Sequence, residues 1–120
     1  MKTGIILFAH GSRVDAANDA VRAMASALAR AGGFVQVQVA FLELGRPNLE
    51  EAVASVAEGG AARVVIVPYF LTLGLHMERD LPSLVKDISL KYNGLEISVT
   101  APLDGHPALV DVLLDRVRNV

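Results

Sequence analysis

Strand-like and helix-like segments alternate along the whole of this 120-residue chain. Four short, largely apolar segments predict strands, at residues 3–9, 34–41, 63–68 and 95–100. Segments with apolar residues at helical spacing predict helices over residues 15–31, from 48 to the Gly59-Gly60 pair, from about 80 to 92, and from 107 to about 118. Because each strand is followed by a helix, the pattern predicts an α/β fold with parallel strands.

The four strands are expected to form one doubly wound parallel sheet with helices on both faces. Residues 3–9 are an almost unbroken apolar run, which is typical of a strand covered on both sides. Residues 34–41 alternate valine with glutamine, which is typical of an edge strand. Right-handed crossovers and the common order of small doubly wound domains predict the strand order 2-1-3-4 within a single domain over residues 1–120.

Details of the helices also follow from the sequence. Asn48 and Glu51 are spaced to form a capping box at the start of the second helix. Pro82 is expected in the first turn of the third helix, after a long apolar loop over residues 69–76. The last helix is expected to turn an inner face toward the sheet, made of Leu109, Val112, Leu113 and Val117.

Composition and missing motifs exclude several classes of function. The chain has no cysteine, which excludes disulfides, cysteine-based metal sites and a cysteine nucleophile. It also lacks G-x-S-x-G, G-x-x-x-x-G-K-[ST] and G-x-G-x-x-G, and so the usual hydrolase and phosphate-binding motifs. A net charge of −2 without a basic stripe argues against a nucleic-acid partner. No apolar run reaches the roughly 20 residues of a membrane span, so we expect a cytoplasmic protein with no membrane partner.

Apolar residues make up 52% of the chain, which is high for a single small domain. The excess predicts either an apolar surface buried between subunits or an apolar pocket kept open for a ligand.

The predicted topology places two of the three histidines at one crevice. In open parallel sheets, ligands bind beyond the carboxyl ends of the strands where the strand order reverses. His10 follows the first strand and His76 ends the loop after the third, so both are expected at this point. A lone histidine at a strand end is more often structural, but two at one switch point make a functional pair an equal alternative.

Further residues on the same rim have both a functional and a structural interpretation. They are Glu43 after the second strand, Ser12 in the first loop, and three arginines, Arg13, Arg46 and Arg79. Glu43 and the arginines are otherwise solvated charges, and Ser12 otherwise makes the strand-to-helix turn. The apolar loop is core, pocket wall or subunit contact, and His106 is expected to cap the last helix.

Several motifs together resemble one family. IILFAHGSR at residues 5–13, FLEL at 41–44, VPYFL at 67–71 and GLHMERDLP at 74–82 follow one another as in the CbiX/SirB family. PLDGHP at 102–107 resembles the C-terminal element of that family. The match spans almost the whole chain, and the combination of motifs is specific although each is weak alone.

The resemblance implies a chelatase-like fold and a lyase that inserts a divalent metal ion into sirohydrochlorin or a related tetrapyrrole without ATP, in cobalamin or sirohaem biosynthesis. It implies that His10 and His76 handle the metal. The metal is a substrate, with Co²⁺ favoured and Fe²⁺ or Ni²⁺ as alternatives, and no organic cofactor is expected. The chain is similar to half of a duplicated longer chelatase, which implies a homodimer.

The candidate residues suit this chemistry. Imidazole binds Co²⁺, Ni²⁺ and Fe²⁺, and two protein nitrogens leave coordination positions open. A neutral histidine or Glu43 is a candidate base for the pyrrole protons. The expected substrate contacts are Ser12, Arg13, Arg46, Tyr69, Phe70, Leu71, Thr72, Leu73, Gly74, Leu75 and Arg79. The alternatives are a tetrapyrrole carrier or metal chaperone without turnover, and a structural subunit of a larger chelatase.

Overall fold

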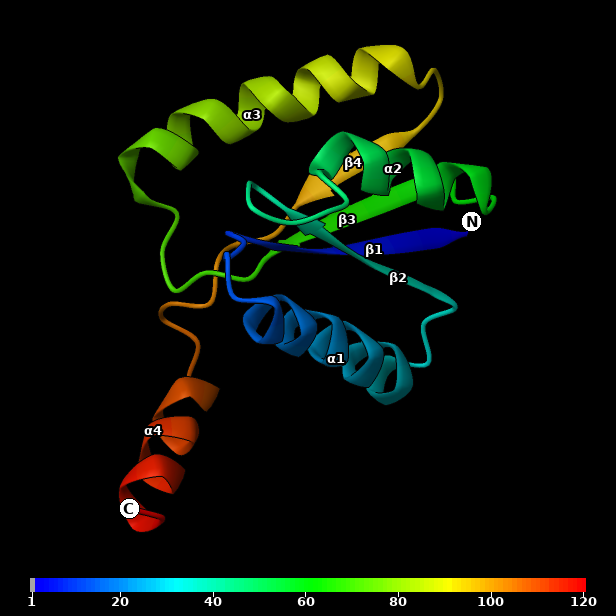
Figure 1. Cartoon of the computed structure of the whole chain (residues 1–120). Helices are drawn as coiled ribbons and strands as arrows, with labels where there is room; N and C mark the ends of the chain where they lie inside the picture. Colours follow the sequence, from blue (N-terminus) through cyan, green and yellow to red (C-terminus); the bar gives the residue numbers. More distant parts are fainter. Residues whose placement is uncertain (1) are drawn as a thin grey trace.

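The computed structural model describes residues 2–120, in which four strands and four helices alternate. The strands are β1 (Thr3–Ala9), β2 (Gln36–Phe41), β3 (Arg63–Pro68) and β4 (Glu96–Val99). The helices are α1 (Asp15–Gly32), α2 (Leu49–Glu58), α3 (Gly74–Lys91) and α4 (Ala108–Arg118). All strand pairs are parallel and the sheet order is β2-β1-β3-β4 (Figure 1), which confirms the predicted α/β class and strand order.

The central strand β1 divides the core into two layers. Six of its seven residues are buried. Ile6 and Phe8 face α2 and α3, whereas Leu7 and Ala9 face α1. Figure 1 shows α2 and α3 on one side of the sheet and α1 on the other. The sheet therefore has helices on both faces, and β1 ends in the middle of its carboxyl edge.

The predicted capping box at the start of α2 is present. The Asn48 side chain accepts a hydrogen bond from the Glu51 N–H at 2.9 Å, and the Glu51 carboxylate accepts one from the Asn48 N–H at 2.9 Å. These two bonds satisfy main-chain donors that the first turn of a helix leaves unpaired. They also fix the end of the loop between β2 and α2, which borders the site described below.

Helix α3 begins earlier than the sequence predicts. It starts at Gly74 rather than near Asp80, so the apolar loop is shorter and His76 lies in the first helical turn. Pro82 lies inside the helix, not in its first turn. The apolar stripe that packs α3 on the sheet explains the difference, because it starts before the proline and consists of Met77, Leu81, Val85 and Ile88. Because proline has no N–H, the Glu78 carbonyl lacks its helical hydrogen-bond donor. Both Pro82 and Glu78 are exposed.

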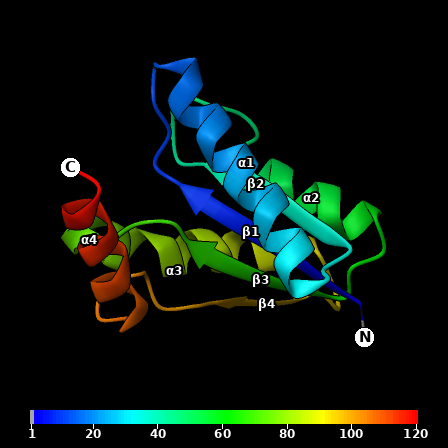
Figure 2. The same cartoon turned by 90° about the horizontal axis from the view of Figure 1, so that it is seen from below.

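The predicted inner face of the last helix is wrong. None of the residues of α4, all within the described range, is buried. Leu113 and Val117 are 65% and 73% exposed, and Figures 1 and 2 show α4 projecting away from the sheet. On the face that α1 covers at β1 and β2, no helix of residues 2–120 covers β3 and β4 (Figure 2). Helical periodicity identifies an apolar stripe, but not the surface that the stripe contacts.

Within residues 2–120, no helix combines the length and the apolar character needed to cross a bilayer.

Candidate functional site

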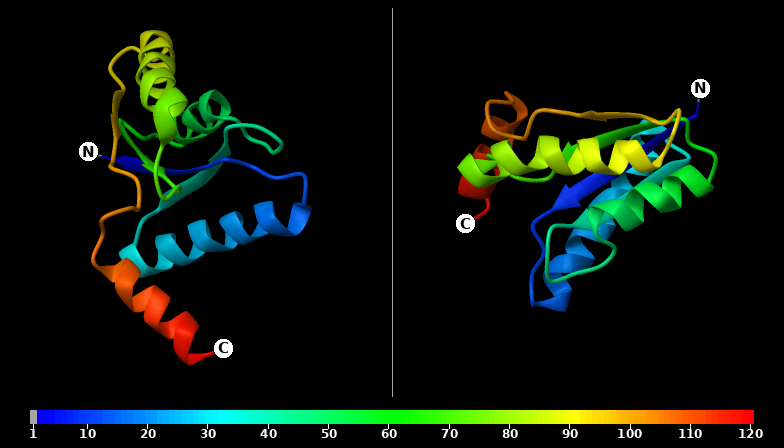
Figure 3. Two further views of the ribbon diagram at one scale, coloured as in Figure 1. Left: turned by 90° about the vertical axis from the view of Figure 1, so that its left-hand side faces the viewer. Right: turned by 90° about the horizontal axis from the view of Figure 1, so that it is seen from above.

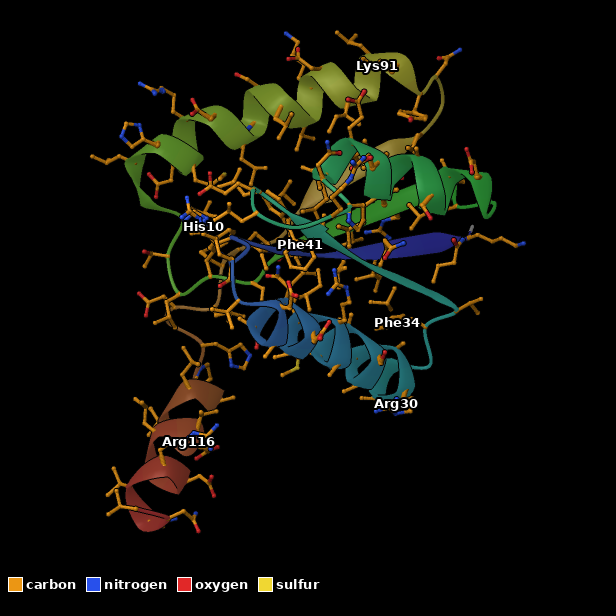
Figure 4. The ribbon with its side chains drawn as sticks, in the orientation of Figure 1. His10, Arg30, Phe34, Phe41, Lys91 and Arg116 are labelled. Carbon is orange, nitrogen blue, oxygen red and sulfur yellow. The ribbon has the colours of Figure 1, made fainter. Side chains whose placement is uncertain are left out.

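The two candidate histidines line one cavity at the carboxyl edge of the sheet. His10 directly follows β1, and His76 lies in the first turn of α3. The cavity has a volume of about 370 Å³ and is open to solvent. Its other lining residues are Leu42, Phe70, Thr72, Leu73, Gly74, Leu75 and Met77. Figure 4 shows His10 just beyond the end of β1, whereas Arg30 and Phe34 lie at the opposite end of the molecule.

Aromatic packing connects His10 to the core. The His10 ring meets Phe70 edge to face, with ring centroids 6.0 Å apart. Phe70 in turn meets the fully buried Phe8 edge to face at 5.9 Å. These are favourable arrangements for aromatic rings, each contributing about 0.5–1.5 kcal/mol beyond area burial. The His10 ring is therefore exposed to a ligand while one side of it is supported.

His76 has a polar neighbour on its own helix. Its Nδ1 lies 3.5 Å from Nη2 of Arg79, one turn further along α3. Because a guanidinium can only donate, this long contact is a hydrogen bond only in the tautomer whose Nδ1 carries no proton. Arg79 Nε donates to Asp80 at 3.1 Å. The guanidinium of Arg79 is thus held beside the histidine on an exposed helix surface.

Close contact between two loops fixes the main chain around His10. Leu42 N–H donates to the Ala9 carbonyl at 2.9 Å, and Glu43 N–H donates to the His10 carbonyl at 3.1 Å. Gly11 has φ +94°, and a Cβ there would lie 1.7 Å from the Glu43 carbonyl oxygen. Only glycine satisfies both conditions, because it tolerates positive φ and allows this close approach.

The predicted apolar loop contributes most, but not all, of its residues to the cavity. Five line it, namely Phe70, Thr72, Leu73, Gly74 and Leu75. Tyr69 instead packs in the core layer beneath α1, and Leu71 is 63% exposed outside the cavity. Leu42 and Met77 also line it and were not predicted. Their adjacency to Glu43 and His76 in the sequence is the signal that could have identified them.

None of the charged candidates is among the residues that line the cavity. Arg46 forms an ion pair with Glu51, whose hydrogen bond and charge raise the pKa of this arginine. Arg13 and Glu43 are exposed on the two loops that meet at His10. Ser12 Oγ accepts a hydrogen bond from the Val14 N–H at 3.0 Å, which is the turn-forming role named as its alternative.

The donor set around the cavity is open rather than closed. Among residues 2–120, no group of three or more histidine, cysteine or carboxylate side chains is placed to hold a metal ion. Two exposed imidazoles on one cavity leave most positions of a metal ion free for other ligands.

The fold and the site together define a doubly wound α/β domain with an open two-histidine cavity at the switch point of its sheet. The model of the CbiX family matches residues 4–120. The chain therefore belongs to the CbiX family, as the motifs indicated.

Two relatives illustrate the range of lengths in the family. The chain is 35% identical over 116 residues to the chloroplastic sirohydrochlorin ferrochelatase of Arabidopsis thaliana, covering 97% of this chain and 52% of the plant protein. It is 29% identical over 135 residues to the sirohydrochlorin cobaltochelatase of Methanopyrus kandleri, covering 96% of this chain and 94% of the archaeal protein. The chain thus spans about half the length of the first relative and nearly all of the second.

A solved structure has the same fold and, like the plant relative, about twice the length of this chain. The sirohydrochlorin chelatase SirB from Bacillus subtilis subspecies spizizenii, determined in complex with cobalt, superposes with a TM-score of 0.88 at 27% identity. The alignment covers 100% of this chain and 51% of SirB. One copy of this chain therefore corresponds to about half of that chelatase.

Proposed function

We propose that this protein inserts a divalent metal ion, Co²⁺ in the first place and Fe²⁺ or Ni²⁺ as alternatives, into sirohydrochlorin without ATP. The observation that carries the proposal is the shared position of His10 and His76 on one open, largely apolar cavity. The names of the two relatives and the cobalt complex of SirB support the substrate and the metal.

In this proposal the two imidazoles bind the metal ion and present it to the macrocycle. Each must be neutral, because a protonated imidazole has no lone pair for a metal. Incomplete coordination by protein allows the four pyrrole nitrogens to displace the histidines in turn. Metal insertion releases two pyrrole protons for each M²⁺ that enters, so charge balances without a redox partner. A histidine freed of metal, or Glu43 on the neighbouring loop, accepts these protons.

The walls of the cavity suit a flat macrocycle with charged substituents. Apolar surface comes from Phe70, Leu73 and Leu75. Leu75 is 85% exposed, which leaves its side chain free to contact a macrocycle. In this proposal, peripheral carboxylates pair with Arg79, which contacts His76, and with Arg13, which is exposed on the His10 loop. Arg46 is the weakest of the three candidates, because Glu51 already neutralises it.

We further propose that the working form is a homodimer in the cytoplasm. Helix α4 presents an apolar stripe to solvent, made of Val110, Leu113, Leu114 and Val117. The sheet is open below β3 and β4, on the side that α1 covers elsewhere (Figure 2). Figure 3 shows α4 separated from that surface of its own chain. A second copy that places its α4 there covers the exposed apolar residues of α4 and the half-buried Val65 and Val67 of β3. Two copies together have about the length of SirB.

An anaerobic insertion assay tests the main proposal. Purified protein is mixed with sirohydrochlorin and Co²⁺, Fe²⁺ or Ni²⁺ in parallel, and the absorption spectrum of the free macrocycle is followed. Many turnovers per chain are expected with at least one metal. Stoichiometric binding of macrocycle or metal without turnover would identify a carrier or chaperone instead, and activity that requires an added protein would identify a subunit of a larger enzyme.

A further inference from the structure

Asn18 is the only polar residue among residues 2–120 that is buried, with 6% of its surface exposed. It lies near the start of α1 and does not line the cavity. An amide is costly to bury unless its hydrogen bonds are satisfied, and here they are. Its Oδ1 accepts from the Ser12 N–H at 3.0 Å. Its Nδ2 donates to the Ser12 carbonyl at 2.9 Å and to the Leu44 carbonyl at 3.0 Å.

These three bonds join the two loops that border the cavity. Ser12 belongs to the loop after β1, two residues beyond His10, and Leu44 belongs to the loop after β2, two residues beyond Leu42. Leu44 has φ +57°, a left-handed conformation that is uncommon for a leucine. The hydrogen bond from Asn18 holds its carbonyl in that conformation. At Gly45 a Cβ would come within 3.1 Å of Nδ2, so the second loop lies directly against the amide.

The same face of α1 makes one more contact with the second loop. Arg22, one turn beyond Asn18, donates from Nη2 to the Arg46 carbonyl at 3.2 Å and lies over the Phe41 ring. The loop after β2 is therefore bound to α1 by side-chain contacts and to the loop after β1 by the main-chain hydrogen bond from Glu43 to His10.

We infer that Asn18 is a positioning residue for His10, acting through the two loops rather than by contact with substrate. The inference rests on the proposed role of His10 in metal transfer. Only a side chain with one acceptor and two donors satisfies Ser12 and Leu44 together, and asparagine is the residue of the right length. Without it, the Leu44 carbonyl loses its donor, and the first loop loses the clamp that sets the direction of the His10 side chain.

Asn18→Asp is the sharpest test, because it keeps the size of the side chain and removes both donors. A carboxylate there faces two carbonyl oxygens instead of donating to them. Ala25→Gly is the matched control, since Ala25 is buried on the same helix and contacts neither loop. It weakens the helix without removing a hydrogen bond to Ser12 or Leu44. Asn18→Ser, a milder neutral variant, replaces Asn18→Asp if the latter does not fold.

Two readouts need no turnover. Amide hydrogen exchange at Leu42 and Glu43 measures whether the loops separate, and titration with Co²⁺ measures metal binding by the free protein. We expect exchange at these two amides to accelerate and Co²⁺ affinity to fall by about tenfold in the Asn18 variant, as for other residues that orient metal ligands. The Ala25→Gly control should lower the melting temperature without either effect.

The exchange measurement tests whether Asn18 joins the two loops, and the Co²⁺ titration tests whether that contact positions His10. Unchanged exchange at Leu42 and Glu43 in the Asn18 variant would overturn it, as would equal acceleration in a control of matched melting temperature. Wild-type affinity for Co²⁺ in a variant whose loops have separated would also overturn it. Failure of the wild-type protein to metallate sirohydrochlorin would instead refute the proposed chelatase activity and leave the exchange result standing.

Discussion

Replacing the three histidines one at a time separates catalysis from stability. His10→Ala and His76→Ala each remove one of the two imidazoles on the cavity, whereas His106→Ala alters the third histidine outside it. The loss of an outer partner of a metal ligand already costs about 10–100-fold in affinity or activity. Removal of a ligand itself should therefore lower kcat/KM by at least about 100-fold, which corresponds to about 2.7 kcal/mol of transition-state stabilisation.

The losses of stability should be small in all three variants and should not follow the losses of activity. His10 and His76 are exposed, so their removal should change the free energy of unfolding by about 0.5 kcal/mol, with up to about 1.5 kcal/mol at His10 from the contact with Phe70. The N-cap residue of α4 is Pro107 rather than His106. The His106 Nδ1 nevertheless accepts a hydrogen bond from the Ala108 N–H at 3.0 Å, at the first residue of the helix. Its loss should cost about 1 kcal/mol while most of the activity remains.

The assay compares initial rates of Co²⁺ insertion with urea denaturation curves for the same four proteins. The expected result is that activity and stability are uncoupled: His106→Ala loses stability comparable to that lost in His10→Ala but keeps most of the activity. Full activity in the His10→Ala, His76→Ala double variant would refute the mechanism even if the protein is a chelatase. A loss in His106→Ala equal to that in His10→Ala would place the last loop in the site.

Three further predictions concern charge and assembly. Neutralising Arg13 and Arg79 should raise KM for sirohydrochlorin and reduce its dependence on salt, while neutralising Arg46 alone should do little; unchanged KM in the triple variant would place the substrate elsewhere. The hydrogen bond from Asn48, followed by that from Arg46, lowers the pKa of Glu51. The ionised Glu51 carboxylate therefore contributes its full stabilisation above the ordinary glutamate pKa of about 4.3, and this stabilisation is lost as the pH falls. The decrease in melting temperature on acidification should be smaller in Glu51→Gln than in the wild type. An identical decrease in both proteins would contradict this assignment. Light scattering at micromolar concentration should give twice the chain mass and Leu113→Glu about half that value, whereas a single-chain mass for the wild type would exclude the dimer.

Local patterns in the sequence were sufficient to predict the fold. The apolar run at β1 and the valine–glutamine alternation at β2 specify a central and an edge strand, because alternate residues of a strand face opposite sides of the sheet. The Asn48–Glu51 spacing specifies its own hydrogen bonds. The start of α3 was missed because Pro82 was assigned to a first turn, although the apolar stripe through Met77 and Leu81 continues before it. That stripe is a packing signal, and packing can override the local preference of one residue.

The site was harder to predict, because its parts are joined by contacts that have no periodicity. Topology alone directs His10 and His76 to one edge of the sheet, since both follow strands that lie side by side. It gives no indication that Asn18, on a helix covering the opposite layer, holds the loop that carries His10. An asparagine early in a helix looks like a capping residue displaced by one turn. Only the structure shows that the Asn18 side chain is buried and that its amide donates to the carbonyl of Leu44, a residue 26 positions away, and so joins two loops.

Helix α4 gives a second reason why the site is hard to predict from the sequence of one chain. Its apolar stripe has the spacing of a packed helix, yet its own sheet leaves the stripe exposed. The same cavity that holds the two histidines is open, and the exposed Leu75 lies on its wall. SirB has about twice this length, and in our proposal a second copy of this chain takes the place of its other half. If that copy is required, Leu113→Glu should lower activity in step with the dimer fraction, although Leu113 contacts neither metal nor macrocycle in our proposal. Full activity in a monomeric Leu113→Glu variant would show that one chain forms a complete site.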